Sequence, residues 1–290
     1  MRKSLRRVTS VLFATVCALT VPVVMDSAEA ARAETSCGGL YFKPGGGVYK
    51  CTFDEEFKGS SLNTNNWLVQ TTAATGFSPG GECFVNNPNN VRVSGGYLNL
   101  TVRREAAPFV CPSPSGNFVT QYTSGTVSTW GKFAQAYGRW EIRAKFPAAT
   151  VAGLQESLWM LPPMPKYGKW PWSGEIDIAE SYSQYANYAV PYFHYVWLTD
   201  LSPTKLCKIS VGDFHKYVLE WTTDSLKVSI DGATCIDDAW NPSPPLVKPQ
   251  PFDQPFMVAL SQALGVGANA PTAATPLPAT TQVDYVKVWS

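Results

Sequence analysis

Three acidic residues stand close together in segment 170–180, which reads Trp-Pro-Trp-Ser-Gly-Glu-Ile-Asp-Ile-Ala-Glu. Successive side chains of a β-strand point to opposite faces, so Glu175 and Asp177 share one face while the residue between them points into a core. Strict alternation would turn Glu180 to the opposite face. One extra residue, a β-bulge at 178–179, returns Glu180 to the side of the other two carboxylates.

This cluster of carboxyl groups fits acid and base catalysis. Carboxylates on one face repel one another and destabilise the fold, unless a proton is shared and the charge is used. The alternatives are a solvated polar face and a calcium-binding cluster. A polar face would more often include Thr, Lys or Ser, and calcium would favour ligands from loops and backbone carbonyls. Trp170 and Trp172 beside the acids fit a platform for a sugar ring better, although loop packing remains an alternative for Trp172.

The elements that position these residues are expected to be strands. Alternating or β-rich runs recur along the chain, separated by Gly, Pro, Asn and Asp, and no window shows a sustained helical stripe. Many strands at short spacing predict an all-β chain folded as a two-sheet sandwich or jelly roll. The expected runs are 90–103, 125–129, 138–144, 175–180, 192–198, 215–221, 225–230, 256–260 and 282–289.

Two other motifs do not fit the chemistry that they suggest. Residues 76–80 match G-x-S-x-G, but Pro79 has no N–H to build an oxyanion hole. Residues 265–270 match G-x-G-x-x-A, but Pro271 follows at once, so no helix can begin there to bind a pyrophosphate. Both segments are predicted to be loops.

Charge and composition exclude several classes of partner. The 290-residue chain carries 23 basic and 22 acidic side chains, so it lacks the basic surface that a nucleic acid or an anionic membrane needs. Its 10 Trp, 13 Tyr and 14 Phe residues favour strands and platforms for sugars. With two histidines and no C-x-x-C or H-E-x-x-H motif, a zinc site is not expected.

The N-terminal segment has the pattern of a secretory signal peptide. Basic residues at 2–7 precede an apolar run over 8–25 and small-residue sites that end at Ala30 and Ala33. We expect a signal peptide over 1–33, cleaved after Ala30 or Ala33, and a single domain over 34–290. The alternative is an uncleaved membrane anchor, but the run is barely long enough to span a bilayer and Pro22 interrupts it. The mature protein is then expected to be secreted and extracellular, without membrane contact.

Cysteine usage agrees with export. One of the seven cysteines, Cys17, lies in the signal segment. An even number then remains, which in a secreted chain indicates disulfides, and six cysteines allow fifteen connectivities. We predict that neighbours pair, because each pair brackets a short stretch of expected hairpin. The pairs are Cys37 with Cys51, Cys83 with Cys111, and Cys207 with Cys235.

The acid-bearing segment resembles the E-x-D-x-x-E signature of glycoside hydrolase family 16 in its bulged form, which occurs in laminarinases, agarases and carrageenases. The resemblance covers most of the chain after the N-terminal segment and is close to laminarinases of the actinobacterial, secreted type. It also rests on residues 137–145, 158–162, 170–171, 214–221, 231–232 and 283–288.

The resemblance implies a concanavalin-like β-jelly-roll sandwich of two curved antiparallel sheets, with a cleft on the concave face. It implies a retaining endo-β-1,3-glucanase that hydrolyses laminarin-type β-1,3-glucan by double displacement, without a cofactor. Glu175 would be the nucleophile and Glu180 the acid/base. Asp177 would hold Glu175 by sharing a proton or a hydrogen bond. Retention requires the two carboxyl groups to lie about 5–5.5 Å apart.

Other functions remain open beside hydrolysis of β-1,3-glucan. They are a non-catalytic β-glucan-binding module, the same mechanism on a mixed-linkage glucan or a galactan, and transglycosylation. Non-catalytic relatives tend to lose the three acids, so their presence favours an enzyme. The expected partner is a polysaccharide substrate, and the protein is expected to be a monomer.

Two segments depart from the laminarinase pattern. Where relatives often read Gly-Leu-Trp-Pro-Ala, residues 153–157 read Gly-Leu-Gln-Glu-Ser. Where relatives often read Asn-Leu-Ala-Val-Gly-Gly, residues 261–267 read Ser-Gln-Ala-Leu-Gly-Val-Gly. Both stretches approach the cleft in the family, so linkage and chain-length specificity stay open.

The resemblance also indicates residues that contact the sugar. Trp170 and Trp172 would be its platforms. The family places a histidine near the acids on the following strand, where this chain has His194; a structural histidine is the alternative. Asn90 matches a family asparagine that faces the sugar, with a turn role as the alternative. Arg143 could reach the cleft or pair with an acid on the sheet.

A structural calcium ion on the convex side, remote from the cleft, is a further expectation from the family. Its ligands come from the first and last strands, which correspond here to Glu56 and Asp284, and carbonyls of Gly95 and Gly96 could complete the shell. Such an ion would tie the first strand to the last. The alternative is that Glu56 is a solvated acid and that Asp284 pairs with a lysine.

Overall fold

The computed structural model describes residues 37–198 and 201–290. The expected signal peptide over 1–33 lies outside the described residues. The helical elements are α2 (Thr72–Thr75) and the short 3-10 segments η1 (Ser183–Tyr185) and η3 (Gly267–Asn269). The strands are β1 (Cys51–Glu55), β2 (Leu68–Val69), β3 (Cys83–Phe84), β4 (Val91–Ser94), β5 (Tyr97–Cys111), β6 (Phe118–Ser128), β7 (Gly138–Lys145), β8 (Leu154–Leu161), β9 (Glu175–Tyr182), β10 (Tyr188–His194), β11 (Cys207–Lys208), β12 (His215–Trp221), β13 (Leu226–Ile230), β14 (Ala233–Asp238), β15 (Met257–Leu264) and β16 (Ala279–Trp289).

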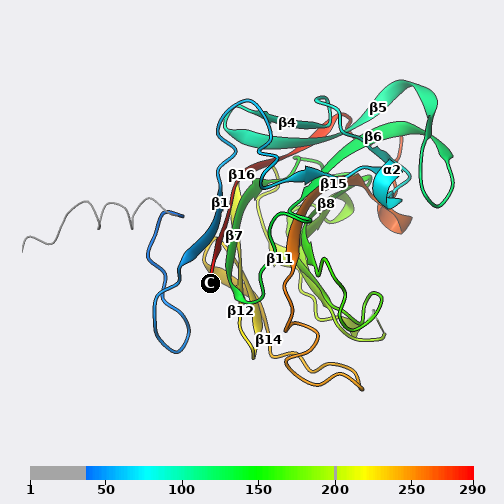
Figure 1. Cartoon of the computed structure of the whole chain (residues 1–290). Helices are drawn as coiled ribbons and strands as arrows, with labels where there is room; N and C mark the ends of the chain where they lie inside the picture. Colours follow the sequence, from blue (N-terminus) through cyan, green and yellow to red (C-terminus); the bar gives the residue numbers. More distant parts are fainter. Residues whose placement is uncertain (1–36, 199–200) are drawn as a thin grey trace, which may run out of the picture.

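The strands form two layers that face each other. One layer follows the order β16-β7-β12-β13-β14, with β1 paired to β16. The other follows β10-β9-β8-β15-β6. The long strands β5 and β6 pair with each other and connect the layers, and Figure 1 shows them across the top of the molecule. Apart from the parallel pairing of β3 with β6, the described pairs are antiparallel. This is the all-β jelly-roll sandwich that the sequence predicted.

Alternation along the strands decides which side chains fill the space between the layers. In β8 the residues at 154, 156, 158 and 160 are buried and the residues between them are partly exposed. One face of β8 therefore packs on the core and the other is free to line a cleft. β8 was not among the strands that the sequence predicted. The run predicted over 192–198 ends as a strand at His194.

Three disulfides join neighbours along the chain, in the pairing that the sequence predicted. They link Cys37 to Cys51, Cys83 to Cys111, and Cys207 to Cys235. The second of them ties the short strand β3 to the end of β5. In the part of the chain that the structure describes, no helix is long and apolar enough to cross a membrane.

Candidate active site

The three acids lie on β9, and the strand contains the predicted bulge. On the β8 side, Leu158 pairs with Ala179 and Trp159 pairs with Asp177, so Ile178 is the extra residue. The pairing of β9 with β10 shifts at the same place. The prediction of a bulge that returns the third acid to the face of the first two is therefore confirmed.

The turn before β9 fixes where the strand begins. Gly174 has φ of 81°, and a Cβ there would lie 3.0 Å from a ring carbon of Phe252, so both the conformation and the space require glycine. Ser173 secures the turn, because its hydroxyl donates to the carbonyl oxygen of Gly168 at 2.7 Å and accepts from the N–H of Tyr167 at 2.9 Å. The turn presents Trp170, whose indole Nε1 donates to Glu175 Oε2 at 2.5 Å.

The acids open into a pocket of about 130 Å³ on the outer face of β8, β9 and β15. Glu175, Asp177 and Glu180 form one part of its wall, as the sequence predicted. The other lining residues come from β8, β15 and the loop after α2, and were not predicted as site residues: Gln155, Ser157, Trp159, Ser261, Ala263, Phe77 and Pro79.

Glu180 is held by neutral hydrogen-bond donors. Its Oε1 accepts from Gln155 Nε2 at 2.9 Å and from Ser157 Oγ at 3.2 Å. Its Oε2 accepts from the Tyr182 hydroxyl at 2.5 Å. Burial and the charge of Glu180 raise the pKa of Tyr182, so that residue remains a phenol that can donate.

Asp177 is 5% exposed and lies beside His194. Its Oδ2 is 3.3 Å from His194 Nε2, and the other ring nitrogen, Nδ1, is 3.0 Å from the hydroxyl of the buried Ser202. The imidazole also stacks on Tyr192, with ring centroids 5.5 Å apart. His194 therefore belongs to the site by geometry.

Burial and mutual repulsion favour the protonated forms of Glu175 and Asp177. The pKa of Glu175 is raised to about 8, first by burial and then by the charge of Asp177. Burial and the charge of Glu180 raise the pKa of Asp177 well above its ordinary range. The charge of His194 and the indole of Trp170 act in the opposite direction on Glu175. At neutral pH the Glu175–Asp177 pair therefore binds at least one proton.

The two tryptophans of the turn differ in their surroundings. Trp170 is 52% exposed next to Glu175 and can offer a face to a sugar. Trp172 packs against Trp197, with ring centroids 5.6 Å apart. Neither tryptophan is among the residues that line the pocket. The contact of Trp172 with Trp197 corresponds to the loop packing that the sequence left as its alternative.

The structure corrects two expected sugar contacts. The side chain of Asn90 is 2% exposed and donates to the carbonyl oxygen of Thr101 at 2.9 Å and to Thr123 Oγ1 at 3.0 Å. Asn90 therefore has the alternative, structural role. Arg143 lies on β7 in the other layer, where its Nη1 donates to Asp284 Oδ2 at 2.5 Å. It pairs with an acid on the sheet and does not reach the cleft.

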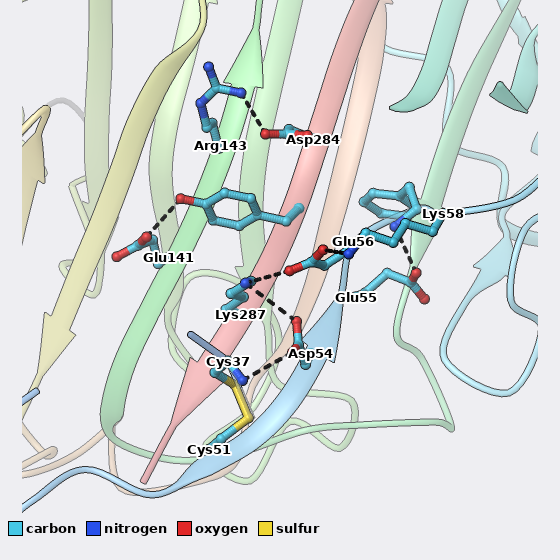
Figure 2. A network of polar contacts seen from close by, with 12 residues as sticks. Cys37, Cys51, Asp54, Glu55, Glu56, Lys58, Glu141, Arg143, Asp284 and Lys287 are labelled. Carbon is cyan, nitrogen blue, oxygen red and sulfur yellow. Dashed lines mark hydrogen bonds and ion pairs between the residues drawn. A yellow bond between two sulfur atoms is a disulfide. The ribbon is translucent and has the colours of Figure 1, made fainter. Parts of the chain in front are cut away.

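The residues that were expected to bind calcium lie at the layer that contains β1, β7 and β16, opposite the candidate active site, which we call the convex layer. Glu56, Asp284, Gly95 and Gly96 line a hollow of about 300 Å³, as the resemblance implied. Figure 2 shows that both carboxylates are already paired with cationic side chains. Lys287 Nζ lies 2.7 Å from Glu56 Oε1 and 3.9 Å from Asp54 Oδ1, and Lys58 binds the second oxygen of Glu56.

This donor set does not fit a calcium ion. Calcium takes six to eight oxygen ligands, whereas the hollow holds ammonium groups against the same carboxylates. Lys287 is only 11% exposed as a side chain, so its charge lies within the network and not in solvent. Glu56 is paired with lysines and Asp284 with Arg143, so the expected metal ligands act here as ion-pair partners.

Known proteins have a similar sequence and a similar fold. The model of the family described as glycosyl hydrolases family 16 matches residues 82–286. The chain is 31% identical over 260 residues to the glucan endo-1,3-beta-glucosidase A1 of Niallia circulans, which covers 82% of this chain and 37% of that relative. It is 32% identical over 175 residues to the keratan-sulfate endo-1,4-beta-galactosidase of Sphingobacterium multivorum, which covers 58% of this chain and 40% of that relative.

Among solved structures, the laminarinase from Rhodothermus marinus superposes with a TM-score of 0.70 at 28% identity. The match covers 83% of this chain and 97% of that one. This chain therefore spans less than half the length of the two relatives above, but nearly the whole of the solved domain.

Proposed function

Because this chain belongs to the glycosyl hydrolases of family 16, we propose that it is an endo-acting β-glucanase that hydrolyses β-1,3-linked glucan with retention of configuration. The observation that carries the proposal is the bulged strand β9, which brings three carboxyl groups to one pocket wall. The names of the relatives indicate β-1,3-glucan first and a β-galactan second. The chemistry needs two carboxyl groups and water, and no cofactor.

Glu175 and Glu180 divide the two steps between them. The carboxylate of Glu175 attacks the anomeric carbon while Glu180 gives its proton to the oxygen of the departing sugar. A water molecule then attacks the glycosyl-enzyme ester, and Glu180 takes up the proton of that water. Trp170 can position the nucleophile and bind the substrate. Its indole N–H donates to Glu175, and its exposed ring can stack on a sugar.

Asp177 has the environment of a carboxylic acid that stays protonated. It is the more buried member of the Glu175–Asp177 pair, and it lies next to both glutamates. When Asp177 is neutral, it no longer raises the pKa of Glu175, whereas Trp170 and His194 still favour the Glu175 carboxylate. The nucleophile can then be ionised at neutral pH in spite of its burial.

Product analysis tests the proposed function. The chain should release oligosaccharides from laminarin, and thin-layer chromatography of digests of laminarin, lichenan and agarose would compare the three substrates. Proton NMR during the first minutes of the digest should show the β-anomer first. Glu175→Gln should abolish turnover and leave glucan binding intact. Turnover by this variant, or α-anomer appearing first, would contradict the proposal.

The same experiment separates the alternatives. Release from agarose without release from laminarin would favour a galactanase, and binding without release from any substrate would favour a glucan-binding module. The presence of all three acids argues against the module. We also propose that the protein is exported, because disulfides persist in oxidising compartments, and that it acts as a monomer.

A further inference from the structure

Two residues of β8 that depart from the laminarinase pattern meet at the acid/base residue. Ser157 lies directly across from Glu180 in the pairing of β8 with β9, and Gln155 lies two residues before Ser157 on the same face. Directly opposite residues have Cβ atoms about 5 Å apart, and diagonal neighbours such as Gln155 and Glu180 are about 7–8 Å apart, which long side chains can still bridge. Both side chains donate to a single oxygen, Glu180 Oε1.

This convergence makes the two oxygens of Glu180 different. A carboxylate oxygen offers two lone-pair sites, and at Oε1 both are used by Gln155 Nε2 and Ser157 Oγ. A proton on Oε1 would displace one of these donors, and the Gln155 amide nitrogen cannot accept in return. Oε2 has only the Tyr182 hydroxyl as a partner among the described residues. The remaining lone-pair site on Oε2 can carry the proton.

We propose that Gln155 and Ser157 are positioning residues that hold Oε1 and leave Oε2 of Glu180 to exchange the proton of the reaction. This inference rests on the proposed role of Glu180 as acid/base. In the first step the Oε2–H bond breaks, the proton joins the glycosidic oxygen, and the electron pair stays on the Glu180 carboxylate. The two donors stabilise that new charge, because hydrogen bonds to an ionised group are stronger than those to a neutral one.

The test compares substrates whose leaving groups differ in how much they need to be protonated by Glu180. Gln155→Met removes the amide donor at similar length, Ser157→Ala removes the hydroxyl, and the double variant removes both. Each lost donor to the forming carboxylate should lower kcat/KM on laminarin about tenfold, and the double variant should lose about a hundredfold. The dinitrophenolate of a dinitrophenyl laminaribioside can leave without being protonated, so kcat/KM for this substrate should fall less than about threefold. Ser157→Thr keeps the hydroxyl and should restore most of the laminarin activity lost in Ser157→Ala.

A pH profile supplies a second readout that simple damage to the strand would not change. Without the donors the ionised form of Glu180 is less favourable, so the basic limb of kcat/KM on laminarin should move to higher pH. Melting curves of each variant check that the fold is kept, and the single variants serve if the double variant does not fold. Equal losses on laminarin and on the aryl glycoside, with an unmoved basic limb, would overturn the inference.

Glu180→Ala, measured in parallel, separates this inference from the proposed function. That variant should show the same preference for the activated glycoside, only larger, and added azide should increase its rate. If Glu180→Ala lacks the preference, the acid/base assignment itself is wrong. If Glu180→Ala shows it and the Gln155 and Ser157 variants do not, only the role of these two residues is wrong.

Discussion

The carboxyl groups of this protein differ in what surrounds them, and their surroundings set their protonation. Glu180 receives three neutral donors, whereas Glu175 receives one and Asp177 lies beside an imidazole. A fourth acid, Glu156, points into the core between the layers, where Gln262 Nε2 donates to its Oε1 at 2.8 Å. These contacts lead to two predictions at the scale of single residues.

The first prediction concerns Asp177. Asp177→Asn replaces the acid with a neutral side chain of the same shape, which is the charge state proposed for Asp177 when Glu175 ionises. The pKa of Glu175 should then hardly change, and the acidic limb of the kcat/KM profile should stay in place. We expect Asp177→Asn to retain about a tenth of the activity, since one hydrogen bond of the site changes. Rates on laminarin from pH 3 to 9 measure this, and an acidic limb that moves to lower pH would show that Asp177 is charged when Glu175 ionises.

The second prediction concerns Glu156 and stability. Burial raises the pKa of Glu156 to about 8 from an ordinary value of 4.5. Between these values the folded protein holds a proton that the unfolded chain has released, so Glu156 makes the fold less stable as pH rises from about 4.5 to about 8. Glu156→Gln keeps the acceptor for Gln262 and removes the titration. Its stability relative to wild type should grow by up to about 1.4 kcal/mol per pH unit in that window.

Urea unfolding of both proteins at pH 5 and at pH 8 checks this prediction. Glu82, Glu175 and Asp177 are also buried acids with raised pKa values, and they contribute a trend of the same sign. Their contribution to the pH dependence of stability is the same in both proteins, so it cancels in the difference between variant and wild type. A stability difference that is the same at both pH values would mean that Glu156 does not titrate in this window.

At the scale of elements, the bulge in β9 decides which face Glu180 occupies. The β8 and β10 ladders both skip one residue of β9 at the same place. If Ile178 is deleted, Ala179 follows Asp177 directly, and both ladders become continuous. Glu180 then lies two positions after Asp177, and two positions along a regular strand keep a side chain on the same face.

We therefore predict that deletion of Ile178 yields a folded protein with measurable laminarinase activity. Ile178 is fully buried, so its loss should cost about 2–4 kcal/mol of stability. Deletion of Ile176 is the matched control, because it turns Glu175 to the opposite face from Asp177 and should abolish activity. Melting curves and reducing-sugar release on laminarin compare the two. Activity in the Ile176 deletion, or none in a folded Ile178 deletion, would contradict the role given to the bulge.

Strand β9 also shows which features of the site could be predicted from the sequence. Alternation along 175–180 was enough to predict the shared face of Glu175 and Asp177, because that depends on local spacing alone. The bulge followed from the expectation that Glu180 lies on the same face as the other two acids.

The role of Arg143 depends on which layer its strand enters, and the role of Asn90 depends on which strands cover the turn before β4. Both are set by pairing between distant strands. The sequence placed the segment 153–157 near the cleft but gave Gln155 and Ser157 no role, because their partner Glu180 is reached only through the register of β8 with β9.

At the scale of the whole molecule, the first and last strands are joined on the convex layer. β1 pairs directly with β16, and Asp54 lies opposite Lys287 in that pairing. The Cys37–Cys51 disulfide closes the chain at the start of β1. Figure 2 shows this disulfide and the ion pairs of Lys287 side by side along the two strands. Linking the two ends in this way restricts the opening of strands that are far apart in sequence.

The last prediction is that an ammonium group, and not calcium, balances the acids of this region. The melting temperature of the wild-type protein should then be the same with EGTA as with added calcium. Lys287→Met leaves Glu56 and Asp54 without their shared cation, so it should cost about 1–2 kcal/mol, or about 2–6 °C in melting temperature. Calcium added to this variant should recover part of the loss, because Glu56 Oε1 and Asp54 Oδ1 then lack the lysine that they share and can bind the ion.

Lys227→Met is a suitable control, since Lys227 pairs with Glu220 at 2.6 Å on a different pair of strands. It should lose no more than a surface ion pair contributes, about 0–1 kcal/mol, and calcium should not change its melting temperature. If EGTA lowers the melting temperature of the wild-type protein, the Lys287 network is not what holds the first strand to the last, and a divalent cation does so. If calcium stabilises Lys287→Met alone, the lysine occupies the place of the ion that the family resemblance implied.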